Sequence, residues 1–260
     1  MFGMNNMSKK KWKKSKLAII LLCLTIICVI CIGIIAISFI NDYEVKNESN
    51  RIYNIIADTT ADNEKFSKNS FEALKKRNSD LIAYLEFDSG IISQPVVQTN
   101  NNDYYLNHSF NKEYYASGTI FMEKNSHLKD TNIVIYGHNN SYDYDIMFSR
   151  LNDIARDQEY YEKNSTFTLY TKNDVRKYVI CYAFYMTDED YEDFFYQQPT
   201  FENGDDFVEY IAFPTSHNLI KSIHGEIEYG NRFVCLQTCK RYDQNTKLVV
   251  LARETSVKEY

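Results

Sequence analysis

A cysteine and a histidine that are far apart in the chain each close a run of apolar residues. Residues 232–239, RFVCLQTC, end on Cys239, and residues 133–137, IVIYG, lead directly into His138. Runs rich in β-branched and aromatic residues predict β-strands, so both side chains are expected at strand ends. A thiol with an imidazole beside it can act as a nucleophile with its own acid and base. The two residues therefore indicate covalent catalysis, on condition that the fold brings these strand ends together.

The remaining cysteines and histidines show no comparable pattern. Outside the apolar N-terminal segment the chain has only Cys181, Cys235 and Cys239, an odd number that leaves at least one thiol unpaired. Cys235 and Cys239 lie on one predicted strand, about 13 Å apart, which is too far for a disulfide. No spacing of cysteines and histidines predicts a zinc site. Structural or exposed roles are expected for the other histidines, which are His108, His127, His217 and His224.

The elements that must position Cys239 and His138 are many short strands and few helices. Strands are predicted at residues 81–87, 94–99, 118–123, 132–138, 166–171, 175–187, 232–239 and 247–253. Helical interruptions are predicted near residues 102–106, 146–154 and 207–213. This pattern is typical of a closed β-barrel with helical insertions. The fold class is therefore expected to be mainly β.

The N-terminal region has the features of a membrane anchor. Six lysines and no acidic residue occupy residues 1–16, a basic tail, and residues 17–40 form an uncharged apolar run. A helix needs about 20 such residues to cross a bilayer, and the lysines place the N-terminus in the cytoplasm. A cleaved signal peptide with residues 36–38 as its cleavage site is the alternative, but its apolar region is usually about 7–15 residues long. We therefore expect a single-pass protein whose catalytic domain, residues 80–260, lies outside the cell.

Residues 41–79 are expected to form a helical lead-in between the membrane and the catalytic domain. Apolar residues at helical spacing predict two short amphipathic helices. The first is centred on Ile52, Ile55 and Ile56, and the second on Phe66, Phe71 and Leu74 with Asp62 or Asn63 as its cap. The chain as a whole has a formal net charge of −6, although its tail is basic. The acidic balance of the remainder argues against nucleic-acid binding.

Several motifs of the β-rich part occur in the order and at the spacing of a known family. They are PVVQTNNNDYYLNHSF, GTIFME, NIVIYGHNN followed by MFSRL, FVCLQTC and LVVLAR. With these motifs the chain resembles the class B sortases, membrane-anchored cysteine transpeptidases of Gram-positive bacteria, over roughly residues 81–253. The resemblance implies a closed eight-stranded sortase-type barrel. It also implies that His138 of YGHN is the general acid and base and that Cys239 is the nucleophile.

Two positions depart from the family pattern. Cys235 replaces the first threonine of the family's TLxTC motif, a small-for-small change with a mild expected effect. The family's third catalytic residue is an arginine that precedes the apolar run of the last strand, and this chain has Lys247 there. Lysine supplies charge without the planar two-donor fork of arginine. We predict that Lys247 takes the role, with Arg241 or Arg232 as alternatives, whereas Arg253 lies about 20 Å further along the strand.

The resemblance implies a transpeptidation reaction. Cys239 would cleave a C-terminal sorting motif of secreted proteins through an acyl-thioester, and the new Thr carboxyl would pass to a peptidoglycan amine. Substrate contacts are expected from Thr238, Gln237 and Asn139, and from the flanking segments 188–203 and 215–229. Neither a cofactor nor a metal is expected, because the acidic residues 188–193 lack the spacing of a calcium loop.

Three other functions are alternatives to cell-wall transpeptidation. A papain-like protease uses the same residue types, but its signature around the cysteine is missing and its histidine lies downstream of the cysteine. The main alternative is a catalytically weak or non-enzymatic binding or scaffold domain. It is favoured mainly by Lys247, which stands where the family has a catalytic arginine. A pilus-assembling sortase is less favoured, because the sequence shows no second, C-terminal membrane span.

Overall fold

The computed structural model describes residues 4–59, 66–139, 147–241 and 243–260. It divides into two compact units, residues 1–53 and 54–260. The first consists of most of a long helix, and the second contains the β-sheet and the site described below.

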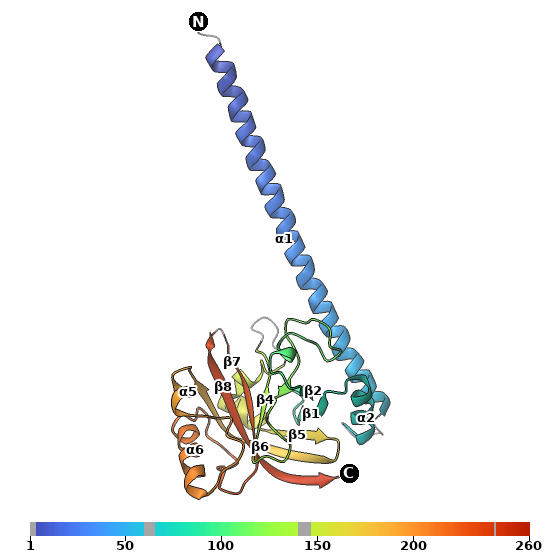
Figure 1. Ribbon diagram of the computed structural model, residues 1–260, viewed down its shortest axis with the longest axis vertical. Helices are drawn as coiled ribbons and strands as arrows, with labels where there is room; N and C mark the ends of the chain where they lie inside the picture. Colours follow the sequence, from blue (N-terminus) through green and yellow to red (C-terminus); the bar gives the residue numbers. More distant parts are fainter. Residues whose placement is uncertain (1–3, 60–65, 140–146, 242) are drawn as a thin grey trace. The chain divides into compact units, whose positions relative to one another are not determined.

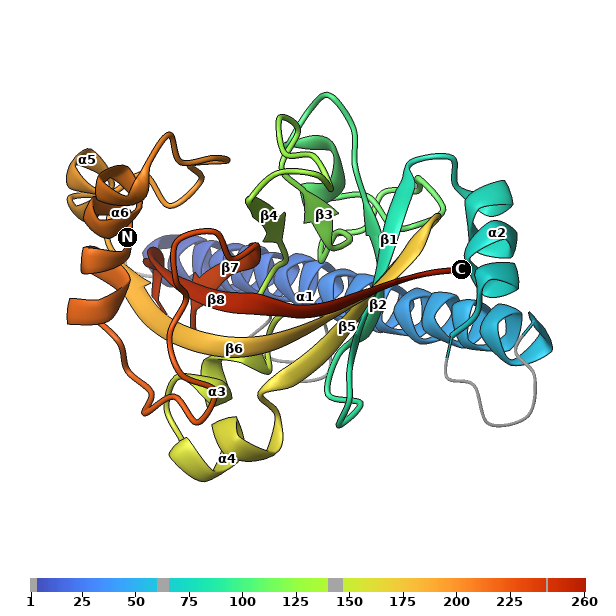
Figure 2. The same cartoon turned by 90° about the horizontal axis from the view of Figure 1, so that it is seen from below.

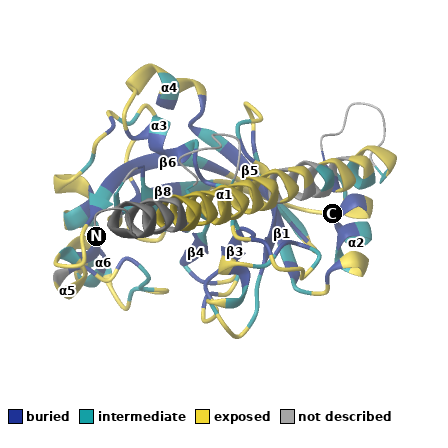
Figure 3. Ribbon diagram, turned by 90° about the horizontal axis from the view of Figure 1, so that it is seen from above, coloured by how far each residue is buried: buried dark blue, intermediate teal, exposed yellow. Residues whose placement is uncertain are grey.

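Helix α1 (Met4–Thr59) is continuous through the apolar run. Its segment Lys16–Ile40 is long and apolar enough to cross a membrane, and none of it is buried in the protein (Figure 3). This segment is a candidate membrane span and coincides with the anchor predicted at residues 17–40. The prediction of a separate first amphipathic helix around Ile52 is wrong, because the helix does not break between the apolar run and Thr59.

The second lead-in helix is present as α2 (Lys68–Arg77), and it buries Phe71 and Leu74. The predicted caps Asp62 and Asn63 lie outside the described residues, and the helix takes its cap from Ser67. The Ser67 hydroxyl accepts from the Ser70 backbone N–H at 3.1 Å. The Ser70 hydroxyl accepts from the Ser67 backbone N–H at 3.3 Å, which completes a capping box. A capping box satisfies two N–H groups that a helix start otherwise leaves unpaired.

The β-rich unit is a closed barrel, as predicted (Figure 1). In the described residues the strands run in the order β1-β2-β3-β4-β7-β8-β6-β5. Their bounds are β1 Leu81–Phe87, β2 Ser93–Val97, β3 Phe121–Met122, β4 Asn132–Tyr136, β5 Thr166–Thr171, β6 Asp174–Met186, β7 Phe233–Lys240 and β8 Asp243–Glu259. The pairs β2–β3 and β4–β7 are parallel, and the other neighbours are antiparallel.

Two strands differ most from their predictions, whereas β2 and β4 each end two residues earlier than expected. β3 pairs only at Phe121 and Met122, although residues 118–123 were expected to be extended. β8 reaches Glu259 because it pairs with β6 from Lys247 onward, and it begins at Asp243 because that residue pairs with Lys240 of β7. Pairing with both neighbours therefore extends β8 beyond its apolar run.

Short helices decorate the barrel. They are η1 (Tyr104–Leu106), α3 (Leu151–Ile154), α4 (Gln158–Lys163), α5 (Asp190–Asp193) and α6 (Gly204–Ser216). The predicted interruptions correspond to η1, α3 and α6, whereas α4 and α5 were not predicted. Figure 2 shows α3 and α4 together at one side of the barrel and α5 and α6 together at another.

The two faces of β7 pack against different cores. Val234 and Leu236 belong to the cluster that fills the barrel. Phe233 and Cys235 belong to a second cluster on the outside, which includes Phe207 of α6. Successive side chains of a strand alternate between faces, so Gln237 and Cys239 continue the outer face. The thiol of Cys239 is thus directed away from the barrel interior.

Candidate active site

The parallel pairing of β4 and β7 brings the ends of these strands to the same edge of the barrel. Tyr136 is the register partner of Gln237, and the Gly137 N–H donates to the Gln237 carbonyl at 3.1 Å. β4 ends at Tyr136, and His138 lies two residues beyond it, while Cys239 lies two residues beyond Gln237 on β7. Two side chains that are distant in sequence therefore lie at one site.

Gly137 allows the backbone before His138 to be packed tightly. A Cβ at this position would lie 2.7 Å from the ring of Phe148, which is closer than real Cβ atoms approach. The Phe148 N–H in turn donates to the His138 carbonyl at 3.0 Å. The glycine of the YGH motif is thus required by the buried ring of Phe148.

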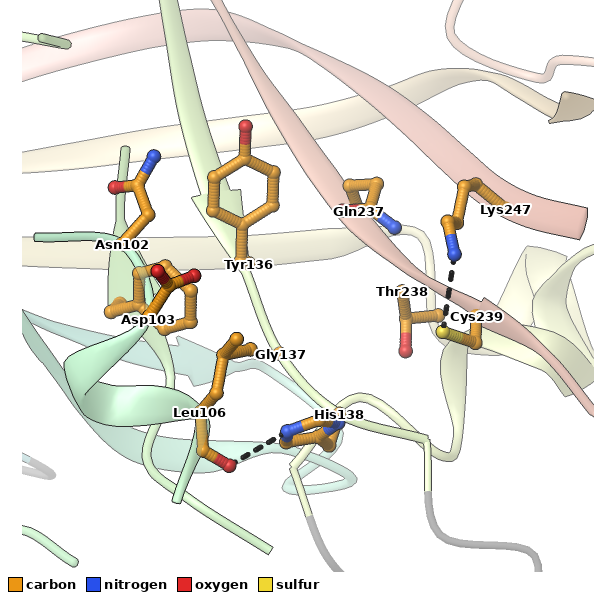
Figure 4. Close-up of a pocket in the computed structure, with 11 residues that line it drawn as sticks. Asn102, Asp103, Leu106, Tyr136, Gly137, His138, Gln237, Thr238, Cys239 and Lys247 are labelled. Atoms are coloured by element: carbon orange, nitrogen blue, oxygen red, sulfur yellow. Dashed lines mark hydrogen bonds between the residues drawn. The ribbon is translucent and has the colours of Figure 1, made fainter. Parts of the chain in front are cut away.

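Cys239 and His138 line one pocket, a cavity of about 270 Å³ (Figure 4). Its walls come from the η1 segment, β3, the end of β4, and the paired ends of β7 and β8. Lys247 lines it as well. The pocket is open to solvent at its mouth and is bounded by the two strand ends, so a peptide backbone can reach the thiol.

Cys239 and Lys247 are direct partners across the antiparallel pair β7–β8. The Lys247 ammonium nitrogen lies 3.8 Å from the Cys239 Sγ (Figure 4). The ammonium is thus close enough to donate to the sulfur. Cys239 is half-buried, whereas Cys235 and Cys181 are fully buried, and all three are free. Burial raises the pKa of the Cys235 thiol, so Cys235 stays protonated and takes no part in such chemistry.

His138 is held at the other side of the pocket. Its Nε2 lies 2.9 Å from the Leu106 carbonyl oxygen of η1 (Figure 4). When that nitrogen carries a proton, the carbonyl accepts a hydrogen bond from it and fixes the ring. The imidazole of His138 and the thiol of Cys239 therefore stand in the same pocket, each held by its own partner.

The alternative cations are engaged elsewhere. The Arg241 guanidinium donates to Asp153 Oδ1 at 2.8 Å and to the Ser149 carbonyl at 3.0 Å, on the α3 side. Arg232 contacts backbone carbonyls of residues 128 and 130, at the far end of β7. Arg253 donates to the His224 carbonyl at 2.9 Å. Among the described residues, Lys247 is the candidate for the family's arginine role that lines the pocket.

The predicted substrate-contact residues divide into two groups. Gln237 and Thr238 line the pocket, although Thr238 is only 1% exposed. Asn139 does not: its Nδ2 donates to the Cys239 carbonyl at 3.1 Å, so it holds the strand end. Asn139 was expected to contact the substrate, and the structure places its side chain next to the pocket, on the backbone of Cys239.

Other pocket residues were not singled out from the sequence. Asn102, Asp103 and Leu106 come from the η1 segment, and Tyr136 comes from the end of β4. The motif that contains residues 102–106 was noted, but nothing in it shows that the segment folds over the edge of the barrel. Figure 4 shows these residues on the side of the pocket opposite Lys247.

The two segments expected to flank the site lie differently. Segment 188–203 reaches the pocket wall, because Gln197 donates to the Tyr136 hydroxyl and accepts from the Tyr191 hydroxyl at 2.7 Å. Burial raises the pKa of Tyr136, so its hydroxyl stays protonated. Segment 215–229 packs on α4 and β6, as shown by the Lys221 N–H that donates to Gln158, and none of its described residues lines the pocket.

Within the described residues, no group of three or more His, Cys, Asp or Glu side chains is arranged to hold a metal ion.

Comparison with known proteins gives the class of this fold and site. The family model described as the sortase domain matches residues 87–255. The chain belongs to the sortase family, whose members are cysteine transpeptidases of the cell envelope.

Several similar proteins are sortases B. Sortase B of Staphylococcus aureus is 28% identical over 184 residues, which cover 70% of this chain and 72% of that protein. Sortase B of Listeria monocytogenes is 28% identical over 181 residues, which cover 68% and 70%. The X-ray structure of Clostridium perfringens sortase B has 31% identity and a TM-score of 0.64, covering 71% of this chain and 99% of that one. The chain is accordingly a class B sortase, and the resemblance noted from its motifs is confirmed.

A substrate complex of S. aureus sortase B has the same fold. Its TM-score is 0.73 at 24% identity, and it covers 84% of this chain and 99% of that one. At this identity the likeness shows the fold alone. It confirms the eight-stranded closed barrel with its helical insertions.

Proposed function

We propose that this sortase cleaves a C-terminal sorting motif of secreted proteins with Cys239, His138 and Lys247 and transfers the new Thr carboxyl to a peptidoglycan amine. The observation that carries the assignment is the meeting of these three side chains in one pocket at the ends of β4, β7 and β8. Sortases act on proteins with sorting motifs and on cell-wall amines. The residue roles and the particular partners are our inference.

Acylation begins at Cys239. The thiolate attacks the carbonyl carbon of the Thr residue in the sorting motif, and the carbonyl electrons move onto oxygen. When the tetrahedral intermediate collapses, the C–N bond breaks and His138 gives a proton to the departing amine. The product is an acyl-thioester on Cys239.

Transfer reverses the roles. An incoming amine attacks the thioester carbonyl, and His138 accepts its proton. The C–S bond breaks, Cys239 leaves as a thiolate, and a new amide remains. Leu106 supports both steps, because its carbonyl holds the imidazole at the pocket while the proton moves.

Lys247 supplies the positive charge of the site. At 3.8 Å it stabilises the Cys239 thiolate before attack, and it can donate to the oxygen that becomes negative during attack. Lysine offers one ammonium in place of the two parallel donors of arginine. The backbone N–H groups at the end of β7 therefore carry a larger part of the oxyanion stabilisation than they do beside an arginine.

The enzyme is proposed to work outside the cell. The lysines of residues 1–16 hold the N-terminus in the cytoplasm, the candidate span Lys16–Ile40 crosses the membrane, and residues 80–260 follow on the outer side. The substrate and the peptidoglycan amine are both reachable there.

The test is to incubate the full-length chain in detergent micelles with a pentapeptide library and an amine such as triglycine. Mass spectrometry should find an acyl adduct on Cys239 and amide products joined to the amine, and the adduct identifies the motif. Cys239→Ala should give neither. The matched control is Cys235→Thr, which changes the other cysteine of the same strand face to the family's residue and should preserve both products.

Absence of any adduct with the unmodified chain, despite binding of peptides, would favour the scaffold alternative. Transfer to lysine side chains of a pilin-type protein in preference to peptidoglycan amines would favour the pilus-assembling alternative.

A further inference from the structure

Among the described residues, the β4–β7 register ends at Tyr136 and Gln237, so β4 supplies no register partner for Cys239. The last β4–β7 hydrogen bond described is the one from Gly137 N–H to the Gln237 carbonyl. In a strand, the carbonyl of residue i and the N–H of residue i+2 point to the same side. The Cys239 carbonyl and the Arg241 N–H therefore both face the position that a longer β4 would occupy.

The side chain of Asn152 fills that position. Its Nδ2 donates to the Cys239 carbonyl at 3.3 Å, and its Oδ1 accepts from the Arg241 N–H at 2.9 Å. One carboxamide thus makes the two contacts that the next peptide unit of a parallel strand would make. Asn152 is fully buried in α3 and does not line the pocket, so it acts on the backbone of β7 and not on a bound peptide.

The segment that carries Asn152 is itself anchored to both sides of the site. Its Phe148 N–H donates to the His138 carbonyl at 3.0 Å. Its Ser149 carbonyl and Asp153 carboxylate accept from the Arg241 guanidinium. Since Phe148 and Ser149 are also fully buried, residues 148–153 form a rigid connection between His138 and Cys239.

We infer that Asn152 is a positioning residue that replaces the missing strand neighbour of β7 and thereby holds the thiol of Cys239 beside Lys247. This inference rests on the proposed role of Cys239 as the nucleophile. Asn139, three residues beyond the end of β4, assists, because its Nδ2 donates to the same Cys239 carbonyl at 3.1 Å. Small displacements of a reacting group can cost about 10²-fold in rate. A substitution of Asn152 that shifts the Cys239 backbone, and with it the sulfur, should therefore lower the rate.

The chain contains a matched control for this arrangement. Asn218 binds the backbone of β6 in the same way. Its Oδ1 accepts from the Ala183 N–H at 2.9 Å, and its Nδ2 donates to the Cys181 carbonyl at 3.4 Å. This is the same bridge from one carboxamide to a carbonyl and to an N–H two residues later. No described residue of β6 lines the pocket, so Asn218 separates an effect on the nucleophile from a general effect on the barrel.

The experiment compares Asn152→Asp with Asn218→Asp in the full-length chain. Each substitution keeps the acceptor for the N–H and replaces the donor to the carbonyl with an oxygen. We expect Asn152→Asp to lower kcat by about 10–100-fold with KM within about threefold, and Asn218→Asp to lower the melting temperature while leaving kcat unchanged. Equal losses of kcat in the two variants, or a wild-type kcat in Asn152→Asp, would overturn the inference.

A second readout needs no substrate. The rate at which iodoacetamide alkylates Cys239, followed by mass spectrometry of its peptide, reports the thiolate directly. At pH 7 this rate should fall several-fold in Asn152→Asp, because the sulfur moves away from the Lys247 ammonium, and should stay at the wild-type value in Asn218→Asp. This result holds even if no sorting peptide is cleaved, so failure of the proposed function is distinguished from failure of the inference.

If Asn152→Asp does not fold, Asn152→Ser takes its place, because it shortens the side chain at the same position without adding a charge. Slower alkylation of Cys239 in this variant supports the inference. Wild-type alkylation overturns it.

Discussion

The two ends of the β7–β8 pair use the same kinds of residue for different purposes. At one end Cys239 pairs with Lys247, and at the other end Phe233 pairs with Arg253. Both ends carry a cation of β8 at a register position opposite β7. At the Lys247 end the cation lines a pocket and lies beside a sulfur, whereas Arg253 donates to a backbone carbonyl.

The Arg253 end is a closed network of structural contacts. Tyr178 donates to the Glu254 carboxylate at 3.0 Å, and Arg176 and Arg232 lie 3.9 Å from it. Arg176 also pairs with Asp174 at 2.7 Å. Burial opposes ionisation of Asp174, but the hydrogen bonds and charge of Arg176 outweigh it and lower the pKa of that carboxyl.

The difference shows why arginines near a site in sequence can be unavailable for it. Arg241 and Arg253 direct their guanidinium groups at carbonyls or carboxylates of the fold, and neither lines the pocket. Charge alone therefore does not distinguish Lys247 from the other cations. Its register position opposite Cys239 does.

The largest expected effect comes from a pair of histidines, one at each end. His138→Gln should lower kcat by about 10²–10⁴-fold, the usual contribution of a positioned acid and base. His224→Gln is the control, because His224 bonds Ser165 at 2.8 Å near the Arg253 end. Steady-state transfer of a sorting peptide to triglycine measures both. A comparable loss in the His224 variant would mean that the two ends are not functionally distinct.

The strands that carry His138 and Cys239 could be predicted from local sequence. The contacts between these strands and other parts of the chain could not, because they join residues that are far apart in sequence. The apolar runs before His138 and Cys239 identify strand ends, because composition and alternation are local signals. Neither apolar run predicts that β4 pairs with β7 in parallel. The bridge from Asn152 depends on a helix of four residues that meets β7 far away in sequence, and no periodic pattern marks it.

The choice among cations shows the same limit. The family pattern predicts Lys247 at the position before the apolar run, and the rise per residue of a strand excludes Arg253. Whether Arg241 folds back into the pocket depends instead on buried partners of α3, which the sequence does not place. The structure turns Arg241 toward Asp153.

A smaller effect should distinguish the two cations of β8. Lys247→Met should lower kcat by about 10²–10³-fold, the usual cost of losing one donor to a developing oxyanion. Lys247→Arg restores charge and donors and should recover most of the activity. Arg253→Met removes a cation of the same strand from the structural end and should reduce the melting temperature without changing kcat. Full activity of Lys247→Met, measured in the same transfer assay, would remove Lys247 from the mechanism.

The smallest effect is a dependence of stability on pH that belongs to the Arg253 end. Burial and the positive charge of Arg253 lower the pKa of His224 in the folded protein. The unfolded chain then binds a proton more readily than the folded one, so His224 contributes stability above its ordinary pKa of about 6.5, and this is lost as pH falls toward the folded pKa. Solvent screens the half-buried ring, so the loss should stay below about 1 kcal/mol, or about 2–4 °C in melting temperature. Thermal melts between pH 7.5 and 5.5 should show a fall that is smaller in His224→Gln than in the wild type. An unchanged slope in His224→Gln would show that the proton uptake lies elsewhere and that this end of β7–β8 does not respond to pH.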